Sequence, residues 1–188
     1  GDNLFHGVGL SEILLKASKQ KSGSTIFASQ VKNPKRYGVI EFKQNKQIKA
    51  IEEKPTNPKS KFAVTGIYFY DNNAVNHAKE LCPSDRGELE ITDLNEIYLK
   101  NNDLKLEIFG RGITWFDTGT FDSLHEASSY IQAIDLRSGL KIGSPEEISW
   151  RKGWINSDQL KKLAVELSNS SYGEYLSNLL DEKNKKSS

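Results

Sequence analysis

Methionine is absent from this chain of 188 residues, and cysteine occurs once, at Cys82. A single cysteine excludes an internal disulfide, so we expect a protein of a reducing, cytoplasmic compartment. No apolar run approaches the roughly 20 residues that a membrane-spanning helix requires. The amino terminus, GDNLFHG, has neither the basic start nor the apolar stretch of a signal peptide. These absences argue against a membrane protein.

An excess of either charge is also missing. Lys and Arg number 26 while Asp and Glu number 25, which gives a formal net charge of +1. Such a balance lacks the basic surface of nucleic-acid-binding proteins, so we expect no nucleic-acid partner. Hydrophobic residues make up 36% of the chain and charged residues 27%, which suits a soluble globular domain.

Strand and helix patterns alternate over the first two thirds of the chain. Ser11 is a candidate cap for the first helix, and Thr120 for the helix that begins the remainder. After Thr120 an apolar stripe of Leu124, Ala127, Ile131 and Ile134 opens a region that is almost entirely helical. The pattern predicts an α/β domain over residues 1–120 and a C-terminal helical region over residues 121–188. Strands are expected at 24–31, 39–43, 47–54, 62–71, 104–110 and 113–116.

An acidic residue directly follows the apolar strand in GRGITWFDTGTF. Asp117 needs a compensating partner there, because burying an unpaired carboxylate costs several kcal/mol. It is either a helix-flanking acid near Thr120 or a metal ligand. Asp2, in GDN, is either part of a turn or a second ligand at the end of another strand. Two carboxylates with water and phosphate oxygens suit Mg²⁺.

Two further stretches carry charges that suit a sugar phosphate. In IEEKP, Glu53 can accept hydrogen bonds from hydroxyl groups and Lys54 can bind phosphate as a point charge. The same triplet also fits a solvated strand edge. In SDRGELEITD, the planar guanidinium of Arg86 suits a phosphate. The residues alone therefore favour a phosphate and magnesium site.

Taken in order, several stretches closely resemble the bacterial glucose-1-phosphate thymidylyltransferases over essentially the whole chain. The motifs are GDNLFHG, RYGVIEF, IEEKP, AVTGIYFYD, RGELEITDLNEIYL, GRGITWFDTGT and PEEISWRKGWI. The resemblance implies a mixed, Rossmann-like sheet with flanking helices and a C-terminal helical annex. It also implies the first step of dTDP-rhamnose synthesis, in which glucose 1-phosphate attacks the α-phosphorus of dTTP to give dTDP-glucose and pyrophosphate. The nucleophile is already ionised, so alignment and charge neutralisation carry the reaction.

The resemblance also implies roles for individual residues. Asp2 and Asp117 match the Mg²⁺ ligands, and Lys54 and Arg86 match catalytic contacts to the sugar phosphate. The other residues that match the sugar half of the site are Gly38, Glu53, Val64, Tyr68 and Trp115, of which Gly38 and Val64 present backbone groups.

A second, regulatory nucleotide site is implied at a subunit interface, with dTDP-rhamnose as the feedback inhibitor. Its pattern falls on Gly7, Leu10, Gly110, Arg111, Glu147, Ile148 and Arg151. The family is typically homotetrameric, so residues 121–188 are expected to form a regulatory and oligomerisation surface. Trp150 and Trp154 fit interface contacts there, while Arg151 also fits a plain surface position.

One departure from the family is clear. The glycine-rich loop of the type G-G-x-G-T-R-L-x-P, which cradles the triphosphate, does not occur in this sequence. We therefore expect a C-terminal portion of the enzyme, inactive alone, with exposed apolar strand edges at 24–31 and 63–71.

Three other functions remain open on the sequence. Uridylyl- and cytidylyltransferases share the architecture, and much of the base-reading surface would lie in the segment that this sequence lacks. A non-catalytic module that binds a sugar phosphate or nucleotide is favoured by the absent loop. A glycosyltransferase is the weakest alternative, because its usual D-x-D metal motif is not found.

Overall fold

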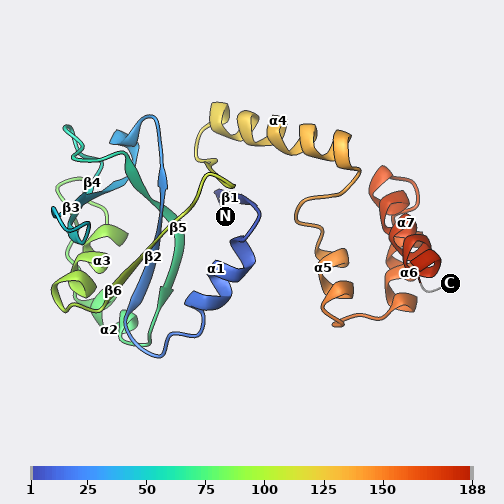
Figure 1. Ribbon diagram of the computed structural model, residues 1–188, viewed down its shortest axis with the longest axis horizontal. Helices are drawn as coiled ribbons and strands as arrows, with labels where there is room; N and C mark the ends of the chain where they lie inside the picture. Colours follow the sequence, from blue (N-terminus) through green and yellow to red (C-terminus); the bar gives the residue numbers. More distant parts are fainter. Residues whose placement is uncertain (1, 187–188) are drawn as a thin grey trace. The chain divides into compact units, whose positions relative to one another are not determined.

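The structure is a computed structural model that describes residues 2–186 (Figure 1). The chain forms two compact units that divide after Ala127, inside helix α4 (Phe121–Ser138). The sequence pattern placed the division at the first residue of that helix. The first unit contains strands β1 (Asn3–Gly7), β2 (Ser24–Gln30), β3 (Gly38–Phe42), β4 (Ile48–Glu53), β5 (Phe62–Tyr70), β6 (Leu104–Ile108) and β7 (Ile113–Asp117).

Five of these strands form one curled mixed sheet in the order β4-β3-β5-β2-β6. Strands β2 and β6 are parallel, while β2–β5 and β3–β4 are antiparallel. Side chains alternate between the faces, so Ile26 and Ala28 join one core cluster and Phe27 joins another. This mixed α/β architecture confirms the predicted fold class.

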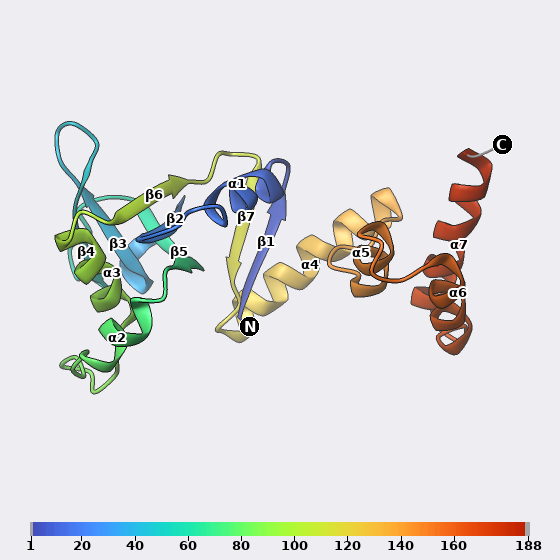
Figure 2. The same ribbon diagram turned by 90° about the horizontal axis from the view of Figure 1, so that it is seen from below.

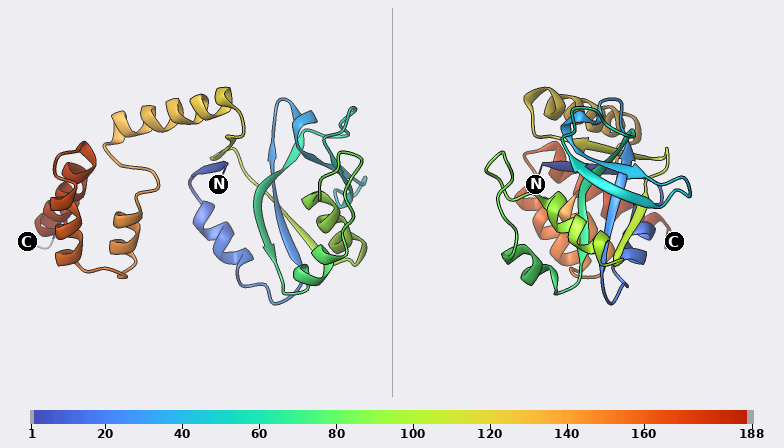
Figure 3. Two further views of the ribbon diagram at one scale, coloured as in Figure 1. Left: turned by 180° about the vertical axis from the view of Figure 1, so that it is seen from behind. Right: turned by 90° about the vertical axis from the view of Figure 1, so that its left-hand side faces the viewer.

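Helices lie on opposite sides of that sheet. Helix α3 (Ile91–Lys100) covers one face with α2 (Ala74–Lys79) nearby, and α1 (Leu10–Ala17) lies on the other side, as the views in Figures 1 and 3 agree. The prediction that Ser11 caps α1 is wrong. Gly9 is the N-cap instead, with φ 87°, a left-handed conformation that glycine adopts without steric cost.

The strands expected to expose apolar edges are central. Strand β2 has β5 on one side and β6 on the other, and β5 lies between β2 and β3. The edges are β4 and β6. The expectation was wrong because hydrophobicity showed that β2 and β5 are buried but could not show which strands flank them.

Strands β1 and β7 form a separate antiparallel ribbon, seen in Figure 2. Its register pairs Asn3 with Asp117 and Gly7 with Ile113. Pairing in this ribbon places the first strand of the first unit beside its last strand. Phe5 of β1 and Ile113 of β7 both belong to the core cluster around Phe27.

The second unit is helical, as predicted. It contains the end of α4, α5 (Pro145–Arg151), α6 (Ser157–Glu166) and α7 (Ser171–Lys186). Ser144 caps α5, and a reciprocal capping box between Asn156 and Gln159 begins α6. Leu160, Ala164, Tyr175, Leu176 and Leu179 form its core.

Two predictions for helix α4, its cap and its apolar stripe, have different outcomes. The predicted cap is confirmed, because Thr120 Oγ1 accepts a hydrogen bond from the Ser123 amide at 3.2 Å. Of the predicted apolar stripe only Ala127 is buried, while the Leu124 side chain is 51% exposed. No helix among residues 2–186 is both long and apolar enough to cross a bilayer.

Candidate functional site

The two predicted metal ligands lie at the same end of the β1–β7 ribbon. Asp117 is the last residue of β7 and pairs with Asn3, the neighbour of Asp2. The Thr118 amide donates to the Asp2 carbonyl at 2.6 Å, which extends the pairing beyond β7. Two acidic residues far apart in the sequence therefore lie at the same end of the ribbon.

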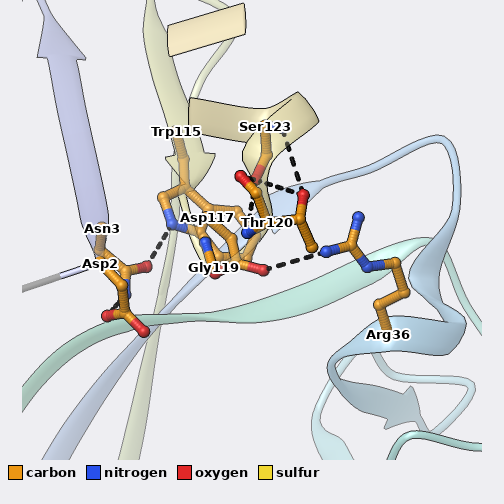
Figure 4. A network of polar contacts seen from close by, with 8 residues as sticks. All are labelled: Asp2, Asn3, Arg36, Trp115, Asp117, Gly119, Thr120 and Ser123. Atoms are coloured by element: carbon orange, nitrogen blue, oxygen red, sulfur yellow. Dashed lines mark hydrogen bonds and ion pairs between the residues drawn. The ribbon is translucent and has the colours of Figure 1, made fainter. Parts of the chain in front are cut away.

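A guanidinium compensates the charge of Asp117. Arg36, at the end of the short 3₁₀ helix η1 (Pro34–Arg36), places Nη2 3.7 Å from Asp117 Oδ2 (Figure 4). The Gly119 amide also donates to Asp117 Oδ1 at 3.4 Å. The sequence analysis did not select Arg36, because nothing in NPKRYG distinguishes it from an ordinary loop cation.

Asp2 is held through a neighbouring amide. Asn3 Nδ2 donates to Asp2 Oδ1 at 3.0 Å, and Asn3 Oδ1 accepts from Trp115 Nε1 at 2.6 Å (Figure 4). An indole nitrogen can only donate, so Trp115 fixes which way the Asn3 amide points. The backbone of Gly66 lies directly against this amide, and a Cβ added there would lie 2.4 Å from Asn3 Nδ2. The sequence analysis did not select Asn3 or Gly66.

The predicted sugar ligand lies at the end of β4. Glu53 Oε2 accepts a hydrogen bond from Thr92 Oγ1 at 2.5 Å, which fixes the carboxylate against α3. Gly38 pairs with Glu53 across the strands, and a Cβ on Gly38 would lie 3.0 Å from Thr92 Oγ1. A glycine at position 38 therefore leaves room beside the Glu53 carboxylate.

Tyr37 connects this strand end to the ribbon. Its carbonyl accepts from the Lys54 amide at 3.0 Å, and its ring lies 5.0 Å from the Trp115 ring. Lys54 itself is exposed and has φ 43°, a turn conformation directly after β4. Burial raises the pKa of the Tyr37 hydroxyl, and the Arg36 charge opposes part of that shift.

The Tyr68 hydroxyl is influenced by the charges of a predicted sugar ligand and a predicted metal ligand. Burial raises its pKa to about 12, and the charges of Glu53 and Asp2 contribute to the same shift. The hydroxyl therefore stays protonated at neutral pH and can donate a hydrogen bond. The influence of both Glu53 and Asp2 on Tyr68 links the end of β4 to the ribbon end.

Two predicted substrate residues have different surroundings. Arg86 is ion-paired with Glu88 at 2.8 Å and Glu90 at 3.1 Å, in the loop before α3. Val64 is buried within β5, so its side chain belongs to the core. Their substrate roles stay predictions.

The predicted regulatory residues fall in both units. Gly7 ends β1, Leu10 begins α1, and Gly110 and Arg111 line a groove with Lys32 and Lys61. In the second unit, the α5 residues have structural partners of their own. Glu147 accepts from Arg151 Nε at 2.6 Å and from the Tyr175 hydroxyl.

The exposed apolar side chains of the second unit are relevant to the predicted subunit interface. Ile148 is 45% exposed and Trp154 is 72% exposed, while Trp150 packs against the helical core. The regulatory site and the tetramer stay predictions.

The donor set around Asp2 and Asp117 fits magnesium. No group of three His, Cys, Asp or Glu side chains that could hold a metal occurs among residues 2–181, the part of the chain whose side chains are described. Mg²⁺ is commonly bound by only one or two carboxylates, with waters and substrate phosphates as its other ligands. A pair of carboxylates at an accessible ribbon end meets that requirement.

Comparisons with known proteins identify the relatives of this chain. The protein is 52% identical over 180 residues to a glucose-1-phosphate thymidylyltransferase of Neisseria meningitidis, covering 96% of this chain and 62% of that protein. It is 51% identical over 181 residues to the enzyme of that name from Mycolicibacterium smegmatis, with the same coverage. The chain therefore spans about three fifths of the length of these relatives.

The fold has a solved counterpart. A crystal structure with sucrose, described as that of a glucose-1-phosphate thymidylyltransferase from Bacillus anthracis, superposes with a TM-score of 0.61 at 40% identity. The superposition covers 76% of this chain and 54% of that one. The profile of the nucleotidyl transferase family matches residues 1–134, which include every predicted metal and substrate residue. The chain belongs to the nucleotidyl transferase family.

Proposed function

We propose that the complete protein forms dTDP-glucose and pyrophosphate from dTTP and glucose 1-phosphate. The observation that carries the proposal is that Asp2 and Asp117 lie at the same end of one ribbon, where the Trp115 indole bonds to Asn3. The two substrates come from the names of the relatives that are about half identical to this chain over the aligned residues.

The proposed mechanism assigns binding and charge to separate residues. Glu53, fixed by Thr92, accepts hydrogen bonds from sugar hydroxyls, and Lys54 neutralises the sugar phosphate. Asp2 and Asp117 would hold Mg²⁺, which supplies positive charge to the phosphates. No proton needs to leave the attacking phosphate oxygen, so the chain contributes alignment and electrostatic stabilisation. dTDP-rhamnose inhibition through the seven-residue regulatory set and a homotetrameric assembly belong to the same proposal.

The direct test is pyrophosphate release by the complete gene product supplied with Mg²⁺ and glucose 1-phosphate. We expect dTTP to be the preferred nucleotide over UTP and CTP. A preference for UTP or CTP would replace the thymidylyl assignment with one of the alternative bases. Binding of dTDP-glucose without turnover of any nucleotide would identify a non-catalytic module.

Lys54→Ala should raise the KM for glucose 1-phosphate by roughly tenfold or more, because a charged contact to phosphate is worth about 1.5–3 kcal/mol. The measurement is initial rate against glucose 1-phosphate at saturating dTTP. Lys59→Ala is the matched control, since it removes an exposed lysine from the following loop. Equal changes in both variants would show that Lys54 has no specific role.

Arg151→Ala should weaken inhibition by dTDP-rhamnose, because the proposed regulatory site loses one of its two arginines. We expect the inhibitor concentration for half-inhibition to rise roughly tenfold. Rates are measured across an inhibitor titration at fixed substrate. Glu147 is paired with both Arg151 and Tyr175, so a thermal unfolding curve of the variant is the control for loss of structure. Full inhibition by the folded variant would contradict the assignment of Arg151.

A further inference from the structure

Arg36 lies beside one of the two proposed metal ligands. Its guanidinium is 3.7 Å from Asp117 and lies over the Tyr37 ring, 5.8 Å from the centroid. Figure 4 shows the side chain reaching from η1 toward the end of β7. Tyr37 in turn packs against Trp115. The contacts of Arg36 with Asp117 and with the Tyr37 ring therefore hold its positive charge next to the Asp117 carboxylate.

The geometry of the Arg36–Asp117 pair allows another cation to take the place of the guanidinium. A separation of 3.7 Å is longer than that of a charge-assisted hydrogen bond, which measures roughly 2.7–2.9 Å. The Arg36 side chain is 46% exposed and that of Asp117 is 23% exposed, so water reaches both. Partly exposed pairs of this kind are weak, and a second cation can replace the first.

We propose that Arg36 is the resident counter-cation of Asp117 and competes with a divalent cation for that carboxylate. The proposal rests on the metal site proposed above for Asp2 and Asp117. Arg36 keeps Asp117 paired in the metal-free protein, and its charge opposes the arrival of a second cation. The concentration of metal needed to fill the site is thereby raised.

The test uses Mn²⁺ as the probe and the complete protein without nucleotide. Free Mn²⁺ is measured by electron paramagnetic resonance through a titration, which reports affinity independently of turnover. Arg36→Gln removes the charge but keeps a polar side chain, and we expect Mn²⁺ to bind about three- to tenfold more tightly. Arg36→Lys keeps the charge and should bind Mn²⁺ within about twofold of the unaltered protein.

Two further variants make the result specific. Lys35→Gln removes a neighbouring charge from η1, and no ion pair with another side chain of residues 2–181 involves Lys35. It should leave Mn²⁺ affinity unchanged, and tightening equal to that of Arg36→Gln would overturn the proposal in favour of a net-charge effect. Asp117→Asn should abolish Mn²⁺ binding.

The failures are distinguishable. If Asp117→Asn abolishes binding while Arg36→Gln leaves it unchanged or weaker, competition by Arg36 is wrong and the metal site stands. If Asp117→Asn binds Mn²⁺ normally, Asp117 is not a ligand, and the inference about Arg36 falls with it.

Discussion

Asp117→Asn should lower the turnover of the complete enzyme by about 100- to 1,000-fold while leaving the fold intact. Asparagine keeps the size of the side chain but loses the negative charge that would hold Mg²⁺, and lost electrostatic stabilisation of this kind costs about 3–4 kcal/mol. The free energy of unfolding should change by only about 1 kcal/mol, because the Arg36 pair is partly exposed. Initial rates across a Mg²⁺ titration, with urea unfolding of the same samples, provide the measurement.

Asp122→Asn is the matched control for this substitution. Asp122 is an exposed acid in the first turn of α4 and has no place in the proposed metal site. Its replacement should leave turnover within about twofold, since surface substitutions are usually mild. An unaltered rate and magnesium dependence in Asp117→Asn would mean that Asp117 only ends its strand and pairs with Arg36.

Phe27→Ala should lower the free energy of unfolding by about 3–5 kcal/mol, the largest stability effect that we expect. Phe27 is fully buried in the middle of β2, with its ring 5.4 Å from Phe109 and 5.9 Å from Phe69. Removal of the ring leaves a cavity beneath α1 and beside the β1–β7 ribbon. Urea denaturation followed by circular dichroism measures the loss.

The chain supplies a matched control for the same chemical change. Phe121, the first residue of α4, is 93% exposed, so Phe121→Ala should shift the free energy of unfolding by no more than about 0.5 kcal/mol. Similar losses in the two variants would contradict the assignment of Phe27 to the principal core of the first unit.

The local sequence pattern predicted the positions of strands and helices well, but it did not predict which strands lie side by side. Alternation and β-branched residues located β2 and β5, and the Thr120 side chain caps α4 as predicted. The order of strands is set by pairing between distant segments, which hydrophobicity does not encode. For that reason the expected exposed edges turned out to be central strands.

The candidate site also contains some residues that the sequence indicates and others that only the structure reveals. Asp117 could be identified as a candidate because an acid directly after an apolar strand is chemically unusual. GDN and IEEKP made Asp2 and Glu53 candidates beside plain structural alternatives, and the family resemblance favoured the functional interpretation. The residues that hold these carboxylates could not be identified from the sequence. Arg36, Asn3 and Thr92 are polar residues in ordinary surroundings, and only the three-dimensional structure brings them to Asp117, Asp2 and Glu53.

The pairing of β1 with β7 also bears on the order in which the molecule assembles. β1 and β7 lie near the two ends of the first unit, so their contact closes a very long loop. Closing that loop costs conformational entropy until the intervening chain has collapsed. During synthesis, β7 leaves the ribosome after every other strand of that unit. The pair of carboxylates at the ribbon end is therefore among the last features to form, and a cation bound by both of them would stabilise only chains that have completed this closure.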